Sequence, residues 1–313
     1  MAYASFAVIH AGPHVSVQDG GRKGMARFGV TRSGAMDRGA LKFANAALGN
    51  PIGASAIEIS IGGLTLKCTE GRISFAVAGG GFVVTIDDVM HPPWCVATIR
   101  AGSTLTIRPG GWGSWAYLAF AGDLQCKAWL GSASTHGSSG FGGGMIAARQ
   151  VLAVENASVT SRREGAIPYP LPQETRSFVR VTLGPQDRFF TSAALSDFQS
   201  RRFTLTNAYD RMGVRLSGPL LPVNAALNMP SEAIVRGSIQ VAGDGVATVL
   251  LADHQTTGGY PKIATVLSDD LDGFAQLRSG ATVKFRAVTP QVAIEAIRAR
   301  QKVLGEYVKT LGD

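Results

Sequence analysis

Short apolar segments that recur at regular spacing constrain the fold of this chain more than any other feature. Six such segments begin between Leu64 and Leu118, namely LTLKC, ISFAVAG, FVVTI, CVATI, STLTIRP and WAYLAF. Turn residues separate them at intervals of about eight to twelve residues, which is typical of a β-barrel or a β-sandwich. The 39 glycines, and the many Val, Ile and Thr residues in short runs, agree with this architecture. We therefore predict a mainly β fold.

The length of 313 residues favours two domains over one. The stretch Ala166–Gln173, AIPYPLPQ, holds three prolines in eight residues and is the best linker in the chain. Thr289 and Pro290 suit the N-cap and first position of an amphipathic helix, whose apolar stripe begins at Ile294. We predict a first domain over residues 1–165, a second over 174–290 and a C-terminal helix over 291–313.

The net charge of +8 does not by itself indicate a nucleic-acid-binding protein. Lys and Arg residues are scattered singly, apart from Arg22-Lys23, Arg162-Arg163 and Arg201-Arg202, and aromatic residues are not interleaved with them. A small anionic substrate or an acidic partner fits this charge better than nucleic acid does. The apolar runs fall far short of the roughly 20 residues that span a bilayer, so we expect no membrane partner.

The cysteine and histidine residues indicate neither a disulfide framework nor a metal site. Cys68, Cys95 and Cys126 are widely spaced and odd in number, which favours a protein of the reducing cytoplasm. His10 and His14 are separated by Gly and Pro, so no helix face joins them, and we predict no bound metal. The N-terminal MAYASFAVIH lacks a basic leader and a small-residue cleavage site, so we expect no signal peptide.

Two carboxylates of the first half each allow two interpretations. Asp37 precedes a helical pattern that Gly49 and Pro51 end, so it suits an N-cap, with a catalytic carboxylate as the alternative. Glu58 lies in the apolar strand AIEISIGG, where an unpaired carboxylate would be costly. It is therefore either paired for structure or part of a site.

The stretch Gly131–Gly144, GSASTHGSSGFGGG, has the composition of a loose linker or of an internal loop such as a lid. Strand-like sequence resumes at Val151–Val154, which favours the internal loop. Neither G-x-x-x-x-G-K-[S/T] nor G-x-S-x-G occurs in the chain, which argues against a P-loop and an α/β-hydrolase nucleophile elbow.

The stretch His254–Val266, HQTTGGYPKIATV, gathers hydroxyl, amide and ammonium groups directly after the apolar run Val246–Ala252. Glycines let backbone N–H groups approach a ligand closely, so the stretch suits a loop that holds an anion or an amide. A hairpin turn with a solvated Lys262 is the alternative. Earlier in the chain, Asp210 and Arg211 form either an ion pair at a turn or a pair in a site, and the sequence favours neither.

These motifs together resemble a known family. In chain order they are VQDGGRKG, FGVTRSGAMD, LKFANAALGNP, AIEISIGG, DRMGVRLSGP, GSIQV, LLADHQTTGGYPKIATV and AQLRSG. The series is similar to the biotin-dependent carboxyltransferase family, also called the allophanate hydrolase subunit 2 or KipA-like family. Its members include the C-type subunit of 5-oxoprolinase, and it matches subdomains A and B of the carboxyltransferase part of urea carboxylase. The resemblance covers about residues 5 to 290.

The resemblance implies two cyclophilin-like β-barrel subdomains, a subunit-1 (KipI-like) partner and a third, LamB/YcsF-type subunit. It implies ATP-linked turnover of a small amide such as 5-oxoproline or urea by the complex. In the first half the motifs carry over these site residues: Gln18, Asp19, Arg22, Ser33, Asp37 and Glu58. In the second half they carry over Asp210, Arg211, Gln240, Asp253, Gln255, Thr256, Thr257, Gly258, Gly259, Tyr260 and Lys262.

The chain departs from the family pattern in two places. Relatives commonly have Ser-Thr-Tyr and Gly-Arg near the glycine-rich loop, where this chain has Ser134-Thr135-His136 and Gly144-Met145. His254 stands where the family usually has an arginine. These differences bear on the substrate.

The chemistry that the resemblance implies places negative charge on an amide-like oxygen. We expect Lys262, Arg211 and the Gly258-Gly259 amides to stabilise that charge, and Asp19 or Asp210 to orient or deprotonate the amide nitrogen. The leading prediction is a subunit of an ATP-dependent 5-oxoprolinase-type amidohydrolase. The enzymatic alternative is a carboxyltransferase that acts on urea or a related amide with carboxybiotin. No Met-Lys-Met biotinylation site occurs in this chain, so the biotin would be carried by another chain. The non-enzymatic alternative is a KipA-like regulator of a sensor-kinase inhibitor.

Overall fold

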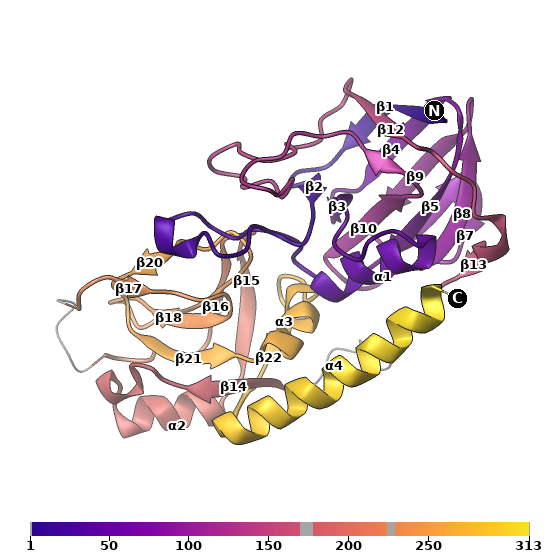
Figure 1. Cartoon of the computed structure of the whole chain (residues 1–313). Helices are drawn as coiled ribbons and strands as arrows, with labels where there is room; N and C mark the ends of the chain where they lie inside the picture. The colour runs from indigo at the N-terminus through magenta and orange to yellow at the C-terminus, as the bar shows by residue number, and fades with distance from the viewer. Residues whose placement is uncertain (1, 170–177, 224–228, 313) are drawn as a thin grey trace. The chain divides into compact units, whose positions relative to one another are not determined.

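The computed structural model describes residues 2–169, 178–223 and 229–312, and the chain divides into two compact units. Unit 1 comprises Met1–Arg22, Ser33–Gln173 and Leu304–Asp313, and unit 2 comprises Lys23–Arg32 and Glu174–Val303. Both units are built mainly of β-strands (Figure 1). The predicted mainly β fold, with a few short helices and a C-terminal helix, is therefore confirmed.

Unit 1 contains two antiparallel sheets. The order of the seven-stranded sheet is β11 (Asp123–Leu124), β12 (Val151–Glu155), β1 (Tyr3–Ala11), β4 (Leu64–Glu70), β9 (Thr104–Arg108), β6 (Val83–Ile86) and β7 (Val89–His91). The order of the six-stranded sheet is β13 (Gly165–Ala166), β8 (Cys95–Arg100), β5 (Arg72–Ala78), β10 (Trp115–Phe120), β3 (Ala56–Ser60) and β2 (Ser16–Gln18). β1 contacts β5 and β4 contacts β8, so the two sheets enclose a common core.

The core of unit 1 forms because the apolar side chains of these strands leave water together. Phe6, Phe75 and Phe120 are fully or almost fully buried, and the rings of Phe6 and Phe120 lie 4.8 Å apart between centroids. Helix α1 (Arg38–Leu48) covers β5 and β10 with its apolar side. The six segments predicted as strands between Leu64 and Leu118 are β4, β5, β6, β8, β9 and β10, and all six are confirmed.

Helix α1 begins and ends as predicted. The Asp37 carboxylate accepts a hydrogen bond from the backbone N–H of Ala40 at 2.9 Å, which is the N-cap geometry. Gly49 follows the last helical residue with a φ of 77°, a conformation that glycine adopts without strain.

Unit 2 is built on one eight-stranded sheet that curls into a nearly closed barrel. Its order is β22 (Thr282–Val283), β15 (Phe203–Tyr209), β16 (Gly213–Ser217), β19 (Ala247–Leu250), β18 (Ser238–Val241), β21 (Lys262–Val266), β14 (Val179–Leu183) and β23 (Phe285–Ala287). A two-stranded sheet pairs β17 (Glu232–Ala233) with β20 (Thr257–Gly258). The β14–β23 pair is parallel, and the other pairs in the eight-stranded sheet are antiparallel.

Two helices cover parts of the barrel of unit 2. Helix α2 (Ser192–Ser200) contacts β23, and helix α3 (Ser268–Ala275) contacts β14. The rings of Phe198, Phe203 and Phe285 form the aromatic centre of this core, with Phe198 and Phe285 stacked at 4.9 Å. Unit 2 also holds the short 3₁₀ helices η1 (Ala26–Phe28) and η3 (Asp187–Phe189), and unit 1 holds η2 (Ser161–Arg163).

Two local predictions were wrong in detail. The weak alternation of apolar residues over Ala7–Val17 predicts a single first strand, but the structure has two, β1 and β2, because the chain turns at Gly12-Pro13-His14. Gly12 packs closely on the backbone of Gly62. A Cβ added to Gly12 would lie 2.3 Å from the Cα of Gly62. The apolar stripe of the last helix was expected to begin at Ile294, but this side chain is 44% exposed. The buried residue at this end of the helix is its neighbour Ala293.

The C-terminal helix α4 (Pro290–Gly312) starts at the predicted proline. Thr289 Oγ1 accepts a hydrogen bond from the N–H of Val292 at 3.3 Å, as an N-cap does. The last four residues of the predicted linker Ala166–Gln173 lie outside the described residues. Its described part lies on unit 1, because the N–H of Ile167 donates to the carbonyl of Trp94 at 2.9 Å.

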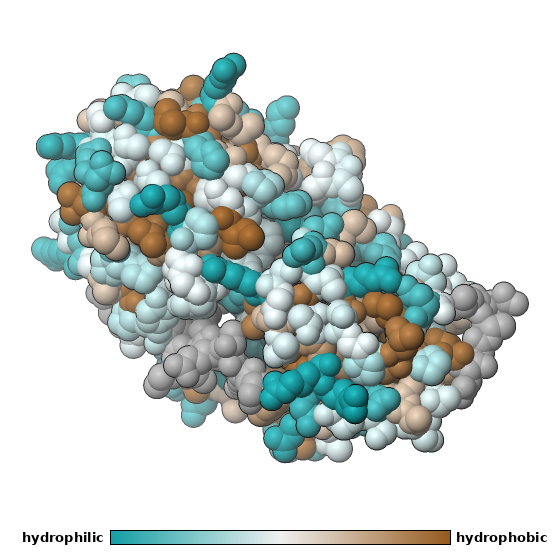
Figure 2. All heavy atoms as spheres, turned by 180° about the vertical axis from the view of Figure 1, so that it is seen from behind, coloured by the Kyte–Doolittle hydropathy of each residue, from teal (hydrophilic) through white to brown (hydrophobic). Residues whose placement is uncertain are grey.

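On the face drawn in Figure 2, hydrophobic side chains lie in small groups among hydrophilic ones. No helix within the described residues combines the length and the apolar character needed to cross a bilayer.

Candidate functional site

Lys262 is the centre of the candidate site in unit 2. It is the first residue of β21, where Gln240 of β18 is its partner across the strands, so both side chains leave the same face of the sheet. Lys262 is 2% exposed and Gln240 is 4% exposed. Within the described residues, the Lys262 Nζ and the Gln240 Nε2 have no hydrogen-bond acceptor. Buried donors without acceptors are rare, and two of them on adjacent strands mark a place suited to an oxygen of a ligand.

Gln186 and Glu232 complete the surroundings of Lys262. The Lys262 ammonium lies 3.6 Å from Glu232 Oε2, and Gln186 Nε2 donates a hydrogen bond to the same carboxylate oxygen. Gln186 Oε1 accepts from the backbone N–H of Lys262 at 3.0 Å, and the Gln186 N–H donates to the Lys262 carbonyl at 3.2 Å. Neither Gln186 nor Glu232 was predicted from the sequence, because no local pattern marks either residue.

The glycines predicted for this loop allow a close approach of side chains. A Cβ on Gly258 would lie 2.9 Å from Gln240 Nε2 and 2.6 Å from Ile234 Cδ1, so only glycine fits there without displacement. Gln255 Nε2 donates to Gln240 Oε1 at 3.3 Å, which orients the Gln240 amide with its N–H groups away from Gln255. Thr257 and Gly258 form β20, and the Thr256 carbonyl accepts from the Ile234 N–H at 3.0 Å.

A surface cavity of about 630 Å³ in unit 2 has Gln240 and Gln255 in its described lining, which does not include Lys262. Four of the predicted site residues line it, namely Asp210, Gln240, Gln255 and Tyr260. Tyr260 is 49% exposed, so its ring is available to a ligand at the rim. Tyr209, the last residue of β15, and Arg215, on β16, also line the cavity and were not predicted as site residues.

Arg211 does not pair with Asp210, although the two are adjacent in sequence. Arg211 Nε and Nη2 donate to the two oxygens of Asp253 at 2.9 and 3.0 Å, and both side chains are buried. The Asp210 carboxylate instead accepts from the N–H groups of Met212 and Gly213 at 2.7 and 3.2 Å, which stabilises the turn between β15 and β16. The bidentate pair fixes Asp253 and Arg211 in the frame of the site.

Three further residues of the predicted loop are His254, Gly259 and Thr257. The His254 carbonyl accepts from Thr31 Oγ1 at 3.0 Å, and its ring Nδ1 lies 2.6 Å from the Gln255 carbonyl. A Cβ on Gly259 would lie 3.3 Å from the Met229 carbonyl, so this glycine also has a close neighbour. Thr257 is exposed.

In unit 1, Asp19 joins its own turn to the glycine-rich loop. Its Oδ1 accepts from the Gly21 N–H at 2.7 Å and from Ser132 Oγ at 2.6 Å, and its Oδ2 accepts from the Ala133 N–H at 2.7 Å. Ser134 Oγ donates to Oδ1 as well. Both carboxylate oxygens therefore serve the loop, and this geometry leaves Asp19 poorly suited to act as a base.

Arg22 and Gln18 fasten the same loop. Arg22 is 2% exposed, donates to the carbonyls of Trp129 and Ser134, and lies with its guanidinium 5.1 Å from the centroid of the Trp129 ring. Gln18 Nε2 donates to Ser16 Oγ and to the Thr135 carbonyl, while Gln18 Oε1 has no donor within the described residues. The stretch Gly131–Gly144 is thus an internal loop held by side chains.

Glu58 is paired inside unit 1. Its Oε2 accepts from the Met36 N–H at 2.7 Å and from the Tyr117 hydroxyl at 2.6 Å, and the Tyr117 oxygen accepts from the Asp37 N–H at 2.8 Å. Burial raises the pKa of the Tyr117 hydroxyl well above its usual value, and the charges of Glu58 and Asp37 raise it further, so Tyr117 stays protonated and donates. This network holds the first turn of α1.

Ser33 is the predicted residue of unit 1 whose hydroxyl remains available. It is 1% exposed, and its Oγ has no hydrogen-bond partner among the described residues. Its φ of 53° is uncommon for a residue with a side chain. A residue held in this conformation with an unbonded hydroxyl is a candidate contact for a ligand.

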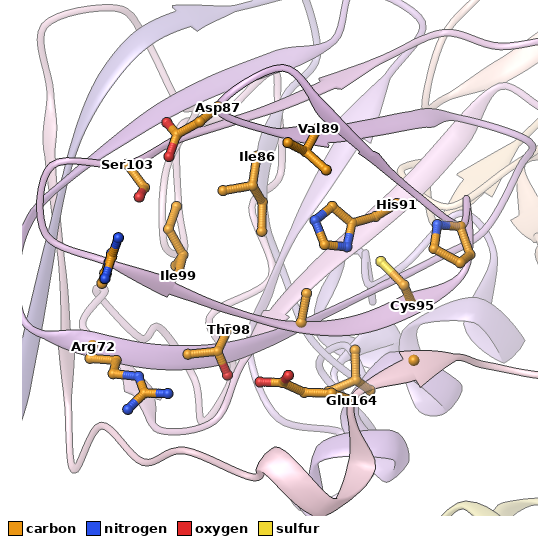
Figure 3. A pocket seen from close by; sticks show the side chains of 15 residues that line it. Arg72, Ile86, Asp87, Val89, His91, Cys95, Thr98, Ile99, Ser103 and Glu164 are labelled. Atoms are coloured by element: carbon orange, nitrogen blue, oxygen red, sulfur yellow. The ribbon is translucent and has the colours of Figure 1, made fainter.

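A second cavity, of about 840 Å³, lies in unit 1 between the edges of its two sheets. Figure 3 shows Ile86, Val89 and Ile99 facing it, with Arg72 and Glu164 at the rim. Its described lining includes none of the predicted site residues. Within the described residues, no group of three or more His, Cys, Asp or Glu side chains is placed to hold a metal ion.

The chain is similar to known proteins over most of its length. The family described as carboxyltransferase domain, subdomain A and B, matches residues 28–287. The C-type subunit of 5-oxoprolinase from Haemophilus influenzae is 33% identical over 98% of both chains, and its counterpart from Escherichia coli is 33% identical over 94% of both. The solved urea amidolyase of K. lactis has a TM-score of 0.89 at 26% identity, over 98% of this chain and 20% of that chain.

These matches confirm the resemblance that the sequence motifs carried. The matched residues include Lys262, its partner Gln240 and the Arg211–Asp253 pair, as well as Glu58 and Asp37 of unit 1. The chain therefore belongs to the carboxyltransferase subdomain A and B family.

Proposed function

We propose that this chain is a subunit of an ATP-dependent 5-oxoprolinase-type amidohydrolase that acts with a subunit-1 (KipI-like) partner. The observation that carries the proposal is the pair of buried donors, Lys262 Nζ and Gln240 Nε2, that lack acceptors within the described residues. The near full-length similarity to two C-type subunits of 5-oxoprolinase supports this reaction over others that need the same donors.

The proposed chemistry follows from what these donors can stabilise. Activation of a cyclic amide such as 5-oxoproline concentrates negative charge on the amide oxygen. A cation and an amide N–H that are already desolvated stabilise such charge strongly, because no water has to reorganise when the charge appears. Lys262 and Gln240 are the residues that we assign to this oxygen.

A carboxylate is needed near the amide nitrogen, and Asp210 suits this role better than Asp19. Asp210 lines the cavity of unit 2, and its carboxylate accepts hydrogen bonds from two backbone N–H groups. Both N–H groups bond the same oxygen, Oδ1, and so fix the orientation of the carboxylate. We assign Asp210 to orient the amide N–H and, when charge develops, to accept its proton.

We assign ATP to the complex, because the glycine-rich loop of this chain does not fit a phosphate. The Ala133 N–H already donates to Asp19, the Gly143 N–H to the Ala133 carbonyl, and the Gly144 N–H to Thr135 Oγ1. A phosphate cradle needs such N–H groups free. The KipI-like partner and a LamB/YcsF-type subunit are proposed to complete the enzyme. Because Cys68, Cys95 and Cys126 are free thiols, we also propose a cytoplasmic location.

The second candidate function is a carboxyltransferase that acts on urea or a related amide. The similarity to the solved urea amidolyase over 98% of this chain favours it. Carboxybiotin, supplied on another chain, would deliver the carboxyl group. The ureido oxygen of biotin carries the same partial negative charge as an amide oxygen, so the donor set of Lys262 and Gln240 also fits this group.

Coexpression with the two partner subunits separates these functions. ATP hydrolysis that depends on 5-oxoproline supports the first, and carboxylation of urea with a biotinylated carrier supports the second. Lys262→Ala should lower turnover by about 10²-fold or more, because a main charge-stabilising donor is removed. Tight partner binding without turnover of any amide would contradict both and support a non-catalytic regulator.

A further inference from the structure

We infer that Gln186 and Glu232 are positioning residues that hold the Lys262 ammonium where the reacting oxygen must arrive. This inference rests on the proposed function of the Lys262 site. Both residues lie far from Lys262 in the sequence: the hydrogen bond between Gln186 and Lys262 joins residues 76 positions apart, and the one between Gln186 and Glu232 joins residues 46 apart.

Gln186 fixes both the backbone of Lys262 and the carboxylate of Glu232. Its Oε1 and N–H bond the N–H and carbonyl of Lys262 at 3.0 and 3.2 Å, and its Nε2 donates to Glu232 Oε2. Gln186 is 2% exposed, so this bracing does not compete with water. Glu232 lies on β17, opposite Gly258 of the glycine loop, which ties the carboxylate to the same loop.

The distance between Glu232 and Lys262 fits a counter-ion better than a stabilising ion pair. At 3.6 Å the two atoms are too far apart for a hydrogen bond, and the Glu232 side chain is 44% exposed. Pairs with one exposed partner stabilise folds little, because water screens them. The carboxylate nevertheless balances a charge that is 3% exposed and that would otherwise be costly to bury.

This arrangement keeps the N–H groups of the ammonium unused while its charge is balanced. The described residues give Lys262 Nζ an ionic neighbour and no hydrogen-bond acceptor. An oxygen that becomes anionic during the reaction can therefore accept from Lys262 without first displacing another acceptor. Gln186 and Glu232 thus act through Lys262 and need not touch the substrate.

Three variants test this role in the complete complex, with Glu306→Gln, an exposed carboxylate of α4, as the matched control. Glu232→Gln keeps the shape and removes the charge, and Glu232→Asp keeps the charge. Gln186→Glu keeps the acceptor for the Lys262 N–H and removes the donor to Glu232. We expect Glu232→Gln and Gln186→Glu to lower kcat by about 10²-fold with little change in KM, because the reacting group is displaced. Glu232→Asp should recover about tenfold of that loss. A kcat of Glu232→Gln within about twofold of the wild type would overturn the inference.

A second measurement on the isolated chain does not depend on the substrate. Acetylation of Lys262 by N-hydroxysuccinimidyl acetate is followed by mass spectrometry of the peptide that contains it. Only the uncharged amine reacts, and a buried ammonium without its counter-ion favours the uncharged form, so Glu232→Gln should speed labelling about threefold or more. Unchanged labelling would overturn the positioning role. Faster labelling of Glu232→Gln in the isolated chain, together with no 5-oxoproline turnover by the wild-type complex, would uphold the positioning role and contradict the proposed function.

Discussion

At the scale of single residues, Asp19 shows how a motif can point to catalysis and the contacts to structure. The family resemblance, through the motif VQDGGRKG, predicted a base or an orienting carboxylate at this position. In unit 1 its two oxygens accept from two backbone N–H groups and two serine hydroxyls of neighbouring loops. A base needs an oxygen that faces the substrate, and these bonds use both.

We expect Asp19→Asn to loosen the glycine-rich loop rather than to abolish the chemistry directly. An amide cannot accept on both of its heavy atoms, so the Ala133 N–H or the serine hydroxyls lose their acceptor. Hydrogen exchange at the Ala133 amide should accelerate by about tenfold, equivalent to about 1.4 kcal/mol of local stability. Unchanged exchange together with lost turnover would contradict the structural role and restore the catalytic one. Ser138→Ala, in the exposed part of the loop, is the control.

The buried thiol of Cys95 makes the free energy of unfolding depend on pH. Burial raises the pKa of its thiol to about 12, against about 8.5 in an unfolded chain. The folded chain holds this proton more tightly, so the stabilisation is complete below about pH 8.5 and is lost as the pH rises towards 12. Cys95→Ala should therefore show a shallower fall of unfolding free energy than the wild type, by up to about 1.4 kcal/mol per pH unit. Urea unfolding between about pH 8 and 10.5 checks this slope. Parallel curves for the two proteins would contradict it.

At the scale of elements, the loop around β20 depends on the absence of a side chain at Gly258. A Cβ there would meet Gln240 Nε2 at 2.9 Å, and Gln240 is one of the two site donors without an acceptor among the described residues. We expect Gly258→Ala to push the Gln240 amide aside and to lower turnover by about tenfold or more, with a small loss of stability. The control is Gly273→Ala in α3, where a Cβ meets nothing within 4 Å and alanine favours the helix. Equal activity of the two variants would show that Gln240 has no part in the site.

Elements with signals in their own sequence were predictable. The Asp37 cap and Gly49 marked both ends of α1, and Thr289-Pro290 marked the start of α4. Helix α3 was missed because no side chain caps it and because it follows β21 directly, with Leu267 between them. The split between β1 and β2 was missed because its cause is the approach of Gly62, a residue from elsewhere in the chain.

The candidate site was predictable to the same extent. Lys262, Gly258, Gln255 and Tyr260 lie in one stretch of sequence, and the family motifs named them with Gln240. The pairing of Arg211 with Asp253 could not be read from the sequence, because adjacency favours Asp210 and only the fold brings Asp253 close. Gln186 and Glu232 were missed for the same reason, since strand pairing in unit 2 places them beside Lys262.

At the scale of the whole molecule, the two units are not continuous in sequence, and composition does not reveal this. The segment Lys23–Arg32 belongs to unit 2, whereas the residues directly before and after it belong to unit 1. Within unit 2, Thr31 Oγ1 donates to the His254 carbonyl at 3.0 Å, next to the predicted loop. This bond joins the segment Lys23–Arg32 to the first residue of the stretch His254–Val266.

This shared segment leads to a prediction for Thr31→Val. The variant keeps the shape of the side chain and removes one hydrogen bond, which costs about 1 kcal/mol. Such a loss raises the population in which the segment is open by about fivefold. Limited trypsin digestion at Arg27 and Arg32, both exposed, should therefore be about five times faster than in the wild type. Thr182→Val, the same substitution on strand β14, should digest at the wild-type rate. Equal rates in all three proteins would mean that other contacts hold Lys23–Arg32 on unit 2, and that the bond to His254 does not determine its position.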